Sequence, residues 1–188
     1  IKRTSPRSFN ASTVEELGRR DDDELIFHTQ AKTTQHLLIF TNKGNVIYRP
    51  VHELSDIRWK DIGEHISQNI TNISNYEEVI YAETLDDFES GIYMAATQEG
   101  QIKRFERKEL SPWRTYRTKS VKFAKLKSDT GQVVTVTPIN LEDIMVITHK
   151  GYALHFSVEE VPVVGPKAAG VKAINLKDDD DIQNVFLT

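Results

Sequence analysis

"LIFTNKGNVIYRPVHEL", residues 38–54, consists of an apolar run, a Thr-x-x-Gly tetrapeptide and an alternating run that ends in Glu-Leu. Two more stretches align with it without a gap: "MAATQEGQIKRFERKEL" at 94–110 and "VITHKGYALHFSVEEV" at 146–161. In each, the Gly follows the Thr by three residues and a Glu follows the Gly by nine. Self-similarity at a spacing of about 50 residues is typical of a chain built from repeated structural units.

The Thr-x-x-Gly tetrapeptide predicts a β-hairpin. Glycine adopts the positive φ of a tight turn without steric strain, and the flanking runs have the length and the β-branched and aromatic content of strands. Further apolar strands are expected at an equivalent point of each unit, starting at Leu25, Val79, Val133 and Val185. One unit then offers four short strands, for example Leu37–Thr41, Val46–Arg49, a stretch near Ile66–Ile73, and Val79–Ala82.

Four strands in about 50 residues have the dimensions of a propeller blade, so we predict an all-β, propeller-like array of about four four-stranded blades. No Trp-Asp pair ends a repeat, which excludes a WD40 propeller, and the paired glycines of kelch repeats are missing. Two more matches support the repeat: "VKFAKLK" (121–127) with "VKAINLK" (171–177), and "IKR" at 1–3 with "IKR" at 102–104. The predicted blades of this single domain cover approximately residues 1–33, 34–87, 88–140 and 141–188, the first without its hairpin.

The composition is that of a globular protein, with 188 residues of which 38% are hydrophobic and 28% charged. The absence of cysteine excludes disulfides and Cys-ligated zinc. The longest apolar runs, such as Leu37–Phe40 and Ile144–Ile147, are too short to span a bilayer. We therefore expect no membrane anchor and a cytoplasmic location.

Positive charge is concentrated in one part of this acidic chain. Residues 103–127 contain ten Lys or Arg and two Glu, a charge of +8, so the net charge of −4 leaves −12 for the rest. Lysines on an exposed edge strand, which discourage aggregation, explain two or three of these charges but not +8. A track that binds phosphates explains the whole stretch, and it would give an affinity that falls steeply with salt.

No pattern in the sequence points to catalysis. The six histidines form none of the spaced pairs that bind metals, and no nucleophile elbow or phosphate-binding glycine loop is present. The acidic runs at 21–24, 77–78 and 178–181 lack the alternating ligands of a calcium loop and are expected to be solvated turns. Tyr116 lies among arginines, but in a loop-and-strand region rather than on the rigid helical support that a nucleophilic tyrosine needs. We expect no catalytic residue, no metal site and no cofactor in this domain.

The connection after each Glu-Leu or Glu-Val carries basic residues: "GRR" at 18–20, "RWK" at 58–60, "WRTYRTK" at 113–119 and "GPK" at 165–167. Equivalent loops of successive blades are expected along one rim, where they would bind and bend duplex DNA with little sequence specificity. Trp113 is expected to pack between blades, because the second repeat holds Trp59 in the same region. The predicted phosphate contacts, with supporting positive charges, are Lys2, Arg3, Arg19, Arg20, Arg58, Lys60, Lys103, Arg104, Arg114, Arg117, Lys119 and Lys122.

Over essentially all 188 residues, the repeats quoted above closely resemble the C-terminal domain of the A subunit of bacterial type IIA topoisomerases. The resemblance implies a β-pinwheel, a propeller-like disc whose four-stranded blades exchange a strand with their neighbours. Members have five or six blades, so about four blades would be a partial disc. Gyrases carry a Q-R-R-G-G-(R/K)-G box in the first blade, whereas "EELGRRDDD" at 15–23 keeps only Gly-Arg-Arg. The chain therefore looks more like the topoisomerase IV (ParC-type) branch.

What the resemblance implies is a module without catalytic residues that binds and bends double-stranded DNA, assisting decatenation of chromosomes and relaxation of supercoils. Its partners would be the remainder of the homodimeric A chain and the ATPase, or B, subunit. ATP and Mg would act elsewhere in that assembly, and the module would be cytoplasmic and associated with the chromosome. Two alternatives remain open: a gyrase-type domain that wraps DNA, and a protein-interaction propeller whose basic rim docks an acidic partner. A hydrolase built on a propeller has no candidate residues.

Overall fold

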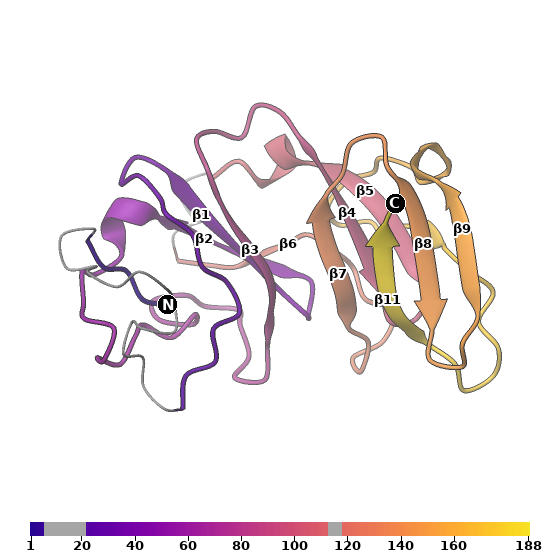
Figure 1. Cartoon of the computed structure of the whole chain (residues 1–188), viewed down its shortest axis with the longest axis horizontal. Helices are drawn as coiled ribbons and strands as arrows, with labels where there is room; N and C mark the ends of the chain where they lie inside the picture. The colour runs from indigo at the N-terminus through magenta and orange to yellow at the C-terminus, as the bar shows by residue number, and fades with distance from the viewer. Residues whose placement is uncertain (6–21, 113–117) are drawn as a thin grey trace.

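The computed structural model describes residues 1–5, 22–112 and 118–188, which form three antiparallel β-sheets arranged along the long axis of the molecule (Figure 1). The first sheet contains β1 (His36–Thr41), β2 (Asn45–Pro50), β3 (Val79–Leu85) and β6 (Val121–Lys122). The second contains β4 (Ile92–Thr97), β5 (Gln101–Glu106), β7 (Val133–Pro138) and β10 (Val171–Lys172). The third contains β8 (Asp143–Thr148), β9 (Ala153–Ser157) and β11 (Ile182–Leu187).

The three predicted hairpins are present, and the same interactions form each turn. Gly44, Gly100 and Gly151 have φ values of 77°, 93° and 87°. In each turn the Gly N–H donates to the carbonyl of the Thr three residues earlier, and the next N–H donates to the hydroxyl of the same Thr. The repeated spacing of Thr and Gly is therefore a requirement of the turn. Each hairpin leads into a one-turn 3-10 helix that carries the repeated Glu: η3 (Val51–Glu53), η4 (Arg107–Leu110) and η6 (Val158–Glu160).

The sheets are stacked face to face, so both faces of the first and second sheets are covered. Leu38 and Phe40 pack against Tyr93 and Phe105 of the second sheet, whereas Leu37 and Ile39 face a separate cluster. A third cluster fills the space between the second and third sheets. Burial on both faces explains why β1 reads as an uninterrupted apolar run rather than an alternating one.

Neighbouring repeats exchange a strand, as the resemblance implies. The third repeat contributes β6 to the sheet of the second repeat, pairing Val121 with Val46 and Lys122 with Asn45. The fourth repeat contributes β10 to the sheet of the third, pairing Val171 with Ile102. These two-residue strands are the beginnings of the matched "VKFAKLK" and "VKAINLK" segments. The fold is thus an all-β, propeller-like pinwheel.

Two predicted strands are absent. The described residues 22–33 contain no strand, and Leu25, Ile26 and Phe27 are 39%, 64% and 38% exposed, so the strand predicted at Leu25 was wrong. The stretch near 66–73 is also not a strand. It is part of the connection between β2 and β3 of the first sheet, contains turns with Asn69 and Asn72 at positive φ, and packs Ile70 into the core. Apolar side chains alone do not make a strand when the backbone has no edge with which to pair.

Candidate nucleic-acid interface

Eight of the twelve basic residues predicted to contact phosphate lie in the described part of the chain. The other four, together with Trp113 and Tyr116, lie outside the described residues; they are Arg19, Arg20, Arg114 and Arg117. The eight described residues fall into two groups according to where the structure places their charged ends.

Four of the eight point into the protein. Lys103 is only 1% exposed, and its Nζ donates to the carbonyls of Gly165, Pro166 and Ala168 at 3.1, 2.9 and 2.9 Å. Burial lowers the pKa of Lys103 to about 8. Arg104 donates from Nε to the carbonyl of Val161, 2.7 Å away. The Lys103 ammonium is therefore not available to a DNA phosphate in this conformation, and the Arg104 guanidinium uses its Nε within the protein.

Lys2 and Arg3 are placed in the same way. Lys2 forms an ion pair with Asp23 and donates to the carbonyl of Trp59 at 2.9 Å. Arg3 donates to the carbonyl of Leu54 at 2.5 Å. The Lys2 side chain is 13% exposed, so these "IKR" segments supply structural contacts rather than surface charge.

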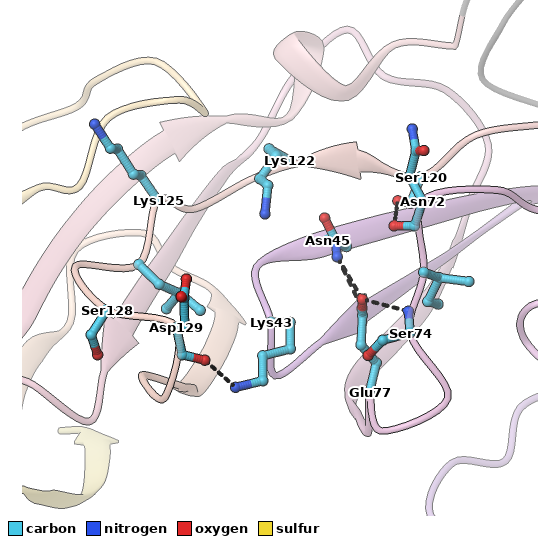
Figure 2. Close-up of a pocket in the computed structure, with 12 residues that line it drawn as sticks. Lys43, Asn45, Asn72, Ser74, Glu77, Ser120, Lys122, Lys125, Ser128 and Asp129 are labelled. Atoms are coloured by element: carbon cyan, nitrogen blue, oxygen red, sulfur yellow. Dashed lines mark hydrogen bonds between the residues drawn. The ribbon is translucent and has the colours of Figure 1, made fainter.

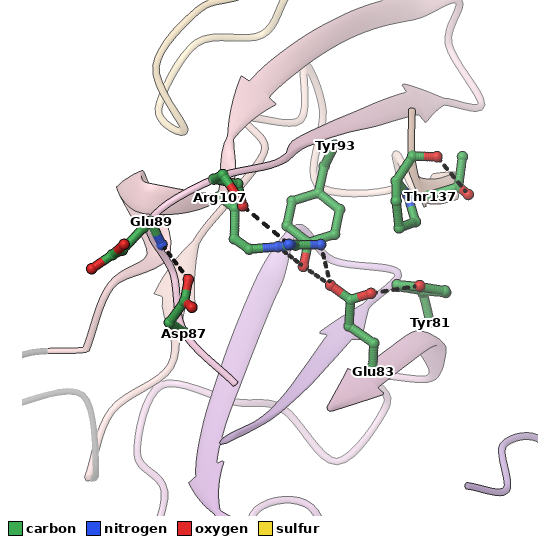
Figure 3. Close-up of polar contacts among 9 residues, drawn as sticks. Tyr81, Glu83, Asp87, Glu89, Tyr93, Arg107 and Thr137 are labelled. Carbon is green, nitrogen blue, oxygen red and sulfur yellow. Dashed lines mark hydrogen bonds and ion pairs between the residues drawn. The ribbon is translucent and has the colours of Figure 1, made fainter. Parts of the chain in front are cut away.

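Arg107, which also belongs to the basic stretch, is used in a contact between the first and second sheets. Its guanidinium lies 3.1 Å from Glu83 and donates to the Tyr93 hydroxyl at 3.2 Å, as Figure 3 shows. The second Glu83 oxygen accepts from Tyr81 at 3.0 Å. Burial, with Glu83 alongside, raises the pKa of Tyr93, so both tyrosines remain neutral hydrogen-bond donors. Part of the +8 counted in the sequence is therefore inside the molecule.

The remaining described residues are exposed. Arg58 pairs with Asp61 three residues later at 3.1 Å, and this hydrogen bond raises the pKa of Arg58. Lys60, Lys119 and Lys122 are exposed, and their ammonium groups make no hydrogen bond or ion pair with another described residue. These lysines are free to meet an external anion.

Lys122 lies in a groove where the connections of the second and third repeats meet. We call this groove, of about 760 Å³, the basic groove, and Figure 2 shows the residues that line it. The β2–β6 pairing places Lys122 opposite Asn45, and the Thr71–Lys119 bridge brings the two connections together. Cationic, amide and hydroxyl side chains dominate the lining, which includes Lys43, Asn45, Asn72, Ser74, Ser120, Lys122, Lys125 and Ser128.

The two carboxylates of the basic groove are Glu77 and Asp129, against the three ammonium groups of Lys43, Lys122 and Lys125. Glu77 accepts hydrogen bonds from the Thr41 hydroxyl, the Asn45 amide and the Ser74 N–H. Lys43 donates to the carbonyls of Asp129 and Gly131. Three charges of one sign against two of the other leave the groove at +1, with Lys119 and Lys127 exposed on the same connection. Such a groove can hold a phosphate by charge and hydrogen bonds.

Arg58 and Lys60 do not line the basic groove. The structure instead brings Lys122 together with lining residues that were not predicted from the sequence to contact phosphate. Lys125 belongs to the basic stretch but was not assigned a contact, and Lys43 lies at a hairpin tip. The signal that could have found Lys43 is the Thr-x-x-Gly turn itself, in which Lys43 is partly exposed although its neighbour Asn42 is buried. Phe123, in contrast, is fully buried between Phe40 and Phe105.

In the described ranges, no group of three or more His, Cys, Asp or Glu is placed to hold a metal ion. The same ranges contain no helix long and apolar enough to cross a membrane.

Comparison with known proteins places the chain among type IIA topoisomerase domains. The family model described as DNA gyrase C-terminal domain, beta-propeller, matches residues 35–86, 92–140 and 142–188. The A subunit of DNA topoisomerase 4 from Streptococcus pneumoniae is 66% identical over 188 residues, and that from Bacillus subtilis 42% over 183. The chain spans about a quarter of the length of these relatives, 23% and 22%.

Several solved structures resemble the fold, including the following two. The crystal structure of the C-terminal domain of DNA topoisomerase IV superposes with a TM-score of 0.89 at 43% identity, covering all of this chain and 57% of that one. The E. coli ParC C-terminal domain gives a TM-score of 0.75 at 18% identity, covering 92% of this chain and 69% of that one, which supports the fold alone.

Proposed function

The chain belongs to the family of DNA gyrase C-terminal, beta-propeller domains, and on this basis we propose that it binds and bends duplex DNA without sequence specificity. In this proposal it is the C-terminal module of the A chain of a topoisomerase IV, since the relatives at 62–66% identity are A chains of topoisomerase 4. It would assist decatenation and relaxation by capturing and curving a DNA segment.

The observation that carries this proposal is the basic groove. Lys122 and Lys125 present exposed ammonium groups beside hydroxyl and amide side chains, in a depression between two repeats. Contacts of this kind neutralise phosphates and fix the position of a duplex, but they do not read bases. No recognition helix occurs in the described ranges, which favours binding through the DNA backbone.

The partners that this function requires are the remainder of the A chain and a B chain that hydrolyses ATP with Mg. Its setting would be the bacterial chromosome in the cytoplasm. Cleavage and ATP hydrolysis are assigned to those other parts of the assembly. We prefer this function to gyrase-type wrapping because residues 15–23 keep only Gly-Arg-Arg of the gyrase box, although residues 15–21 lie outside the described part.

The experiment is a titration of a 30-base-pair duplex with the purified protein over a salt series, with a donor and an acceptor dye at the DNA ends. Binding through phosphates gives a log–log slope of about 0.9 for each phosphate neutralised, and bending raises energy transfer. Equal affinity for unrelated sequences is expected. A protein that binds an acidic polypeptide but not the duplex at low salt would instead be a protein-interaction propeller.

A further inference from the structure

The two Lys-Arg dipeptides of the chain donate hydrogen bonds to backbone carbonyls at equivalent positions of different repeats. Ile1 and Ile102 begin the matched "IKR" segments, and Glu53 and Glu160 are the repeated Glu of the following connections, 107 residues apart. A shift of 107 residues superposes Trp59 on Pro166. Lys2 Nζ donates to the carbonyl of Trp59 and Lys103 Nζ to that of Pro166, both at 2.9 Å.

The arginines repeat the correspondence. Arg3 donates to the carbonyl of Leu54 and Arg104 to that of Val161, again 107 residues apart. The backbones pair at equivalent points too, since Arg3 forms a parallel bridge with Asp56 and Arg104 with Val163. Both dipeptides therefore hold the start of the next connection at the same place.

A glycine in each connection makes the close approach possible. A Cβ on Gly63 would lie 2.4 Å from the carbonyl oxygen of Ile1, and one on Gly170 2.3 Å from that of Ile102. These glycines are also 107 residues apart. We call the Lys-Arg dipeptide with its connection glycine a clasp: Lys2, Arg3 and Gly63 form the first, and Lys103, Arg104 and Gly170 form the second.

Each clasp holds the backbone beside one exposed lysine. Lys60 follows Trp59, whose carbonyl Lys2 holds, and Lys167 lies between Pro166 and Ala168, whose carbonyls Lys103 holds. Lys60 and Lys167 are equivalent in the repeats, and both are exposed. We propose that Lys2 and Lys103 are positioning residues that fix the backbone from which Lys60 and Lys167 present their ammonium groups to DNA phosphates, an inference that rests on the proposed function.

The junction between the second and third repeats provides an internal contrast. The aligned positions there are Ile47 and Tyr48, and the residue equivalent to Gly170 is Ser120. Where the strand carries no Lys-Arg dipeptide, the connection carries no glycine. At the three junctions compared, the Lys-Arg dipeptide and the connection glycine are therefore either both present or both absent.

A double-mutant cycle between Lys103 and Lys167 tests the inference, with duplex affinity over a salt series as the readout. Lys167→Ala should lower the salt slope by about 0.9, the value of one phosphate contact. Lys103→Met should weaken binding only while Lys167 is present, so the double variant should bind like Lys167→Ala alone. Combined with Lys122→Ala, in the unclasped junction, Lys103→Met should act additively.

The outcomes separate the two levels of the proposal. If Lys103→Met weakens binding equally with and without Lys167, or lowers only the melting temperature, the positioning role is overturned. If neither Lys122→Ala nor Lys167→Ala changes duplex binding, the proposed function fails instead. Should Lys103→Met not fold, the same cycle with Lys2→Met and Lys60→Ala tests the first clasp, where the Lys2 side chain is 13% exposed.

Discussion

Arg107 and Glu83 form an ion pair of 3.1 Å across the junction of the first and second sheets, with side chains only 19% and 15% exposed. Glu83 lies on β3, and Arg107 begins the 3-10 helix after β5. A residue that the sequence places within a basic stretch therefore holds two sheets together. The same carboxylate accepts from the hydroxyls of Tyr81 and Tyr93, so one side chain joins three partners.

We expect Glu83→Gln to lower the free energy of unfolding by about 1.5–3 kcal/mol, because it leaves the half-buried Arg107 without its counter-charge. Urea unfolding monitored by fluorescence measures this change in stability. Glu89→Gln, at an exposed position nearby, should change stability little. Equal effects of the two variants would contradict a special role of the Glu83 network.

Charge reversal in the basic groove should weaken DNA binding without unfolding the domain. Lys122→Glu with Lys125→Glu is expected to lower the salt slope by about 1.8, two contacts at about 0.9 each, because both ammonium groups are exposed. Fluorescence anisotropy with a labelled duplex measures the slope. Lys122→Glu and Lys32→Glu change the net charge equally, so a similar loss from both would show that only total charge matters.

Gly170→Ala and Gly151→Ala separate backbone strain from a steric clash. Both glycines have positive φ, 91° and 87°, so both substitutions incur about 1–2 kcal/mol of strain. A Cβ on Gly151 would meet nothing within 4 Å, whereas one on Gly170 would meet the Ile102 carbonyl. We expect Gly170→Ala to be more destabilising by about 1–3 kcal/mol in thermal unfolding. Equal losses would mean that the clasp relaxes freely.

Lys103 should affect how the free energy of unfolding changes with pH in alkaline solution. Its pKa is about 8 in the folded state and 10.5 in the unfolded chain, so between these values the unfolded state binds more protons. This group's contribution to the free energy of unfolding therefore increases as pH rises from about 8 to 10.5. In Lys103→Met that increase should disappear, and at pH 7 the variant should be about 1–3 kcal/mol less stable, since three carbonyls lose their donor. Parallel pH profiles of the two proteins would refute the shift.

Glu64 should account for part of the loss of stability at acid pH. Burial by itself would raise the pKa of Glu64, but the Ser55 N–H and the 2.8 Å contact with Arg49 outweigh it and lower the pKa below 4.5. The stabilisation is therefore present above the unfolded pKa and is lost as pH falls through the lower folded value. Glu64→Gln should remove about 1.5–3 kcal/mol at pH 7 and flatten this acid limb in urea titrations. An unchanged acid limb would contradict the assignment.

The sequence was sufficient to predict the hairpins. Thr41 and Gly44, with their equivalents, specify a local turn whose hydrogen bonds involve only neighbouring residues, so no long-range information is needed. The strands around those turns follow from the same local pattern. The strand predictions near Leu25 and Ile66 were wrong because a strand also needs the edge of another strand to pair with, which the local sequence does not show.

Only the tertiary structure decided which positive charges face solvent. Counting Lys and Arg along the chain gives the net charge of a segment but not which side chains are exposed. Lys103 and Lys122 cannot be distinguished by such a count. Because β6 pairs with the preceding sheet, the Lys122 side chain faces the exposed basic groove. Lys103 is instead covered by residues 165–168 and donates to the carbonyls of Gly165, Pro166 and Ala168. Buried ammonium groups persist only where acceptors surround them, and those acceptors come from a connection more than 60 residues away.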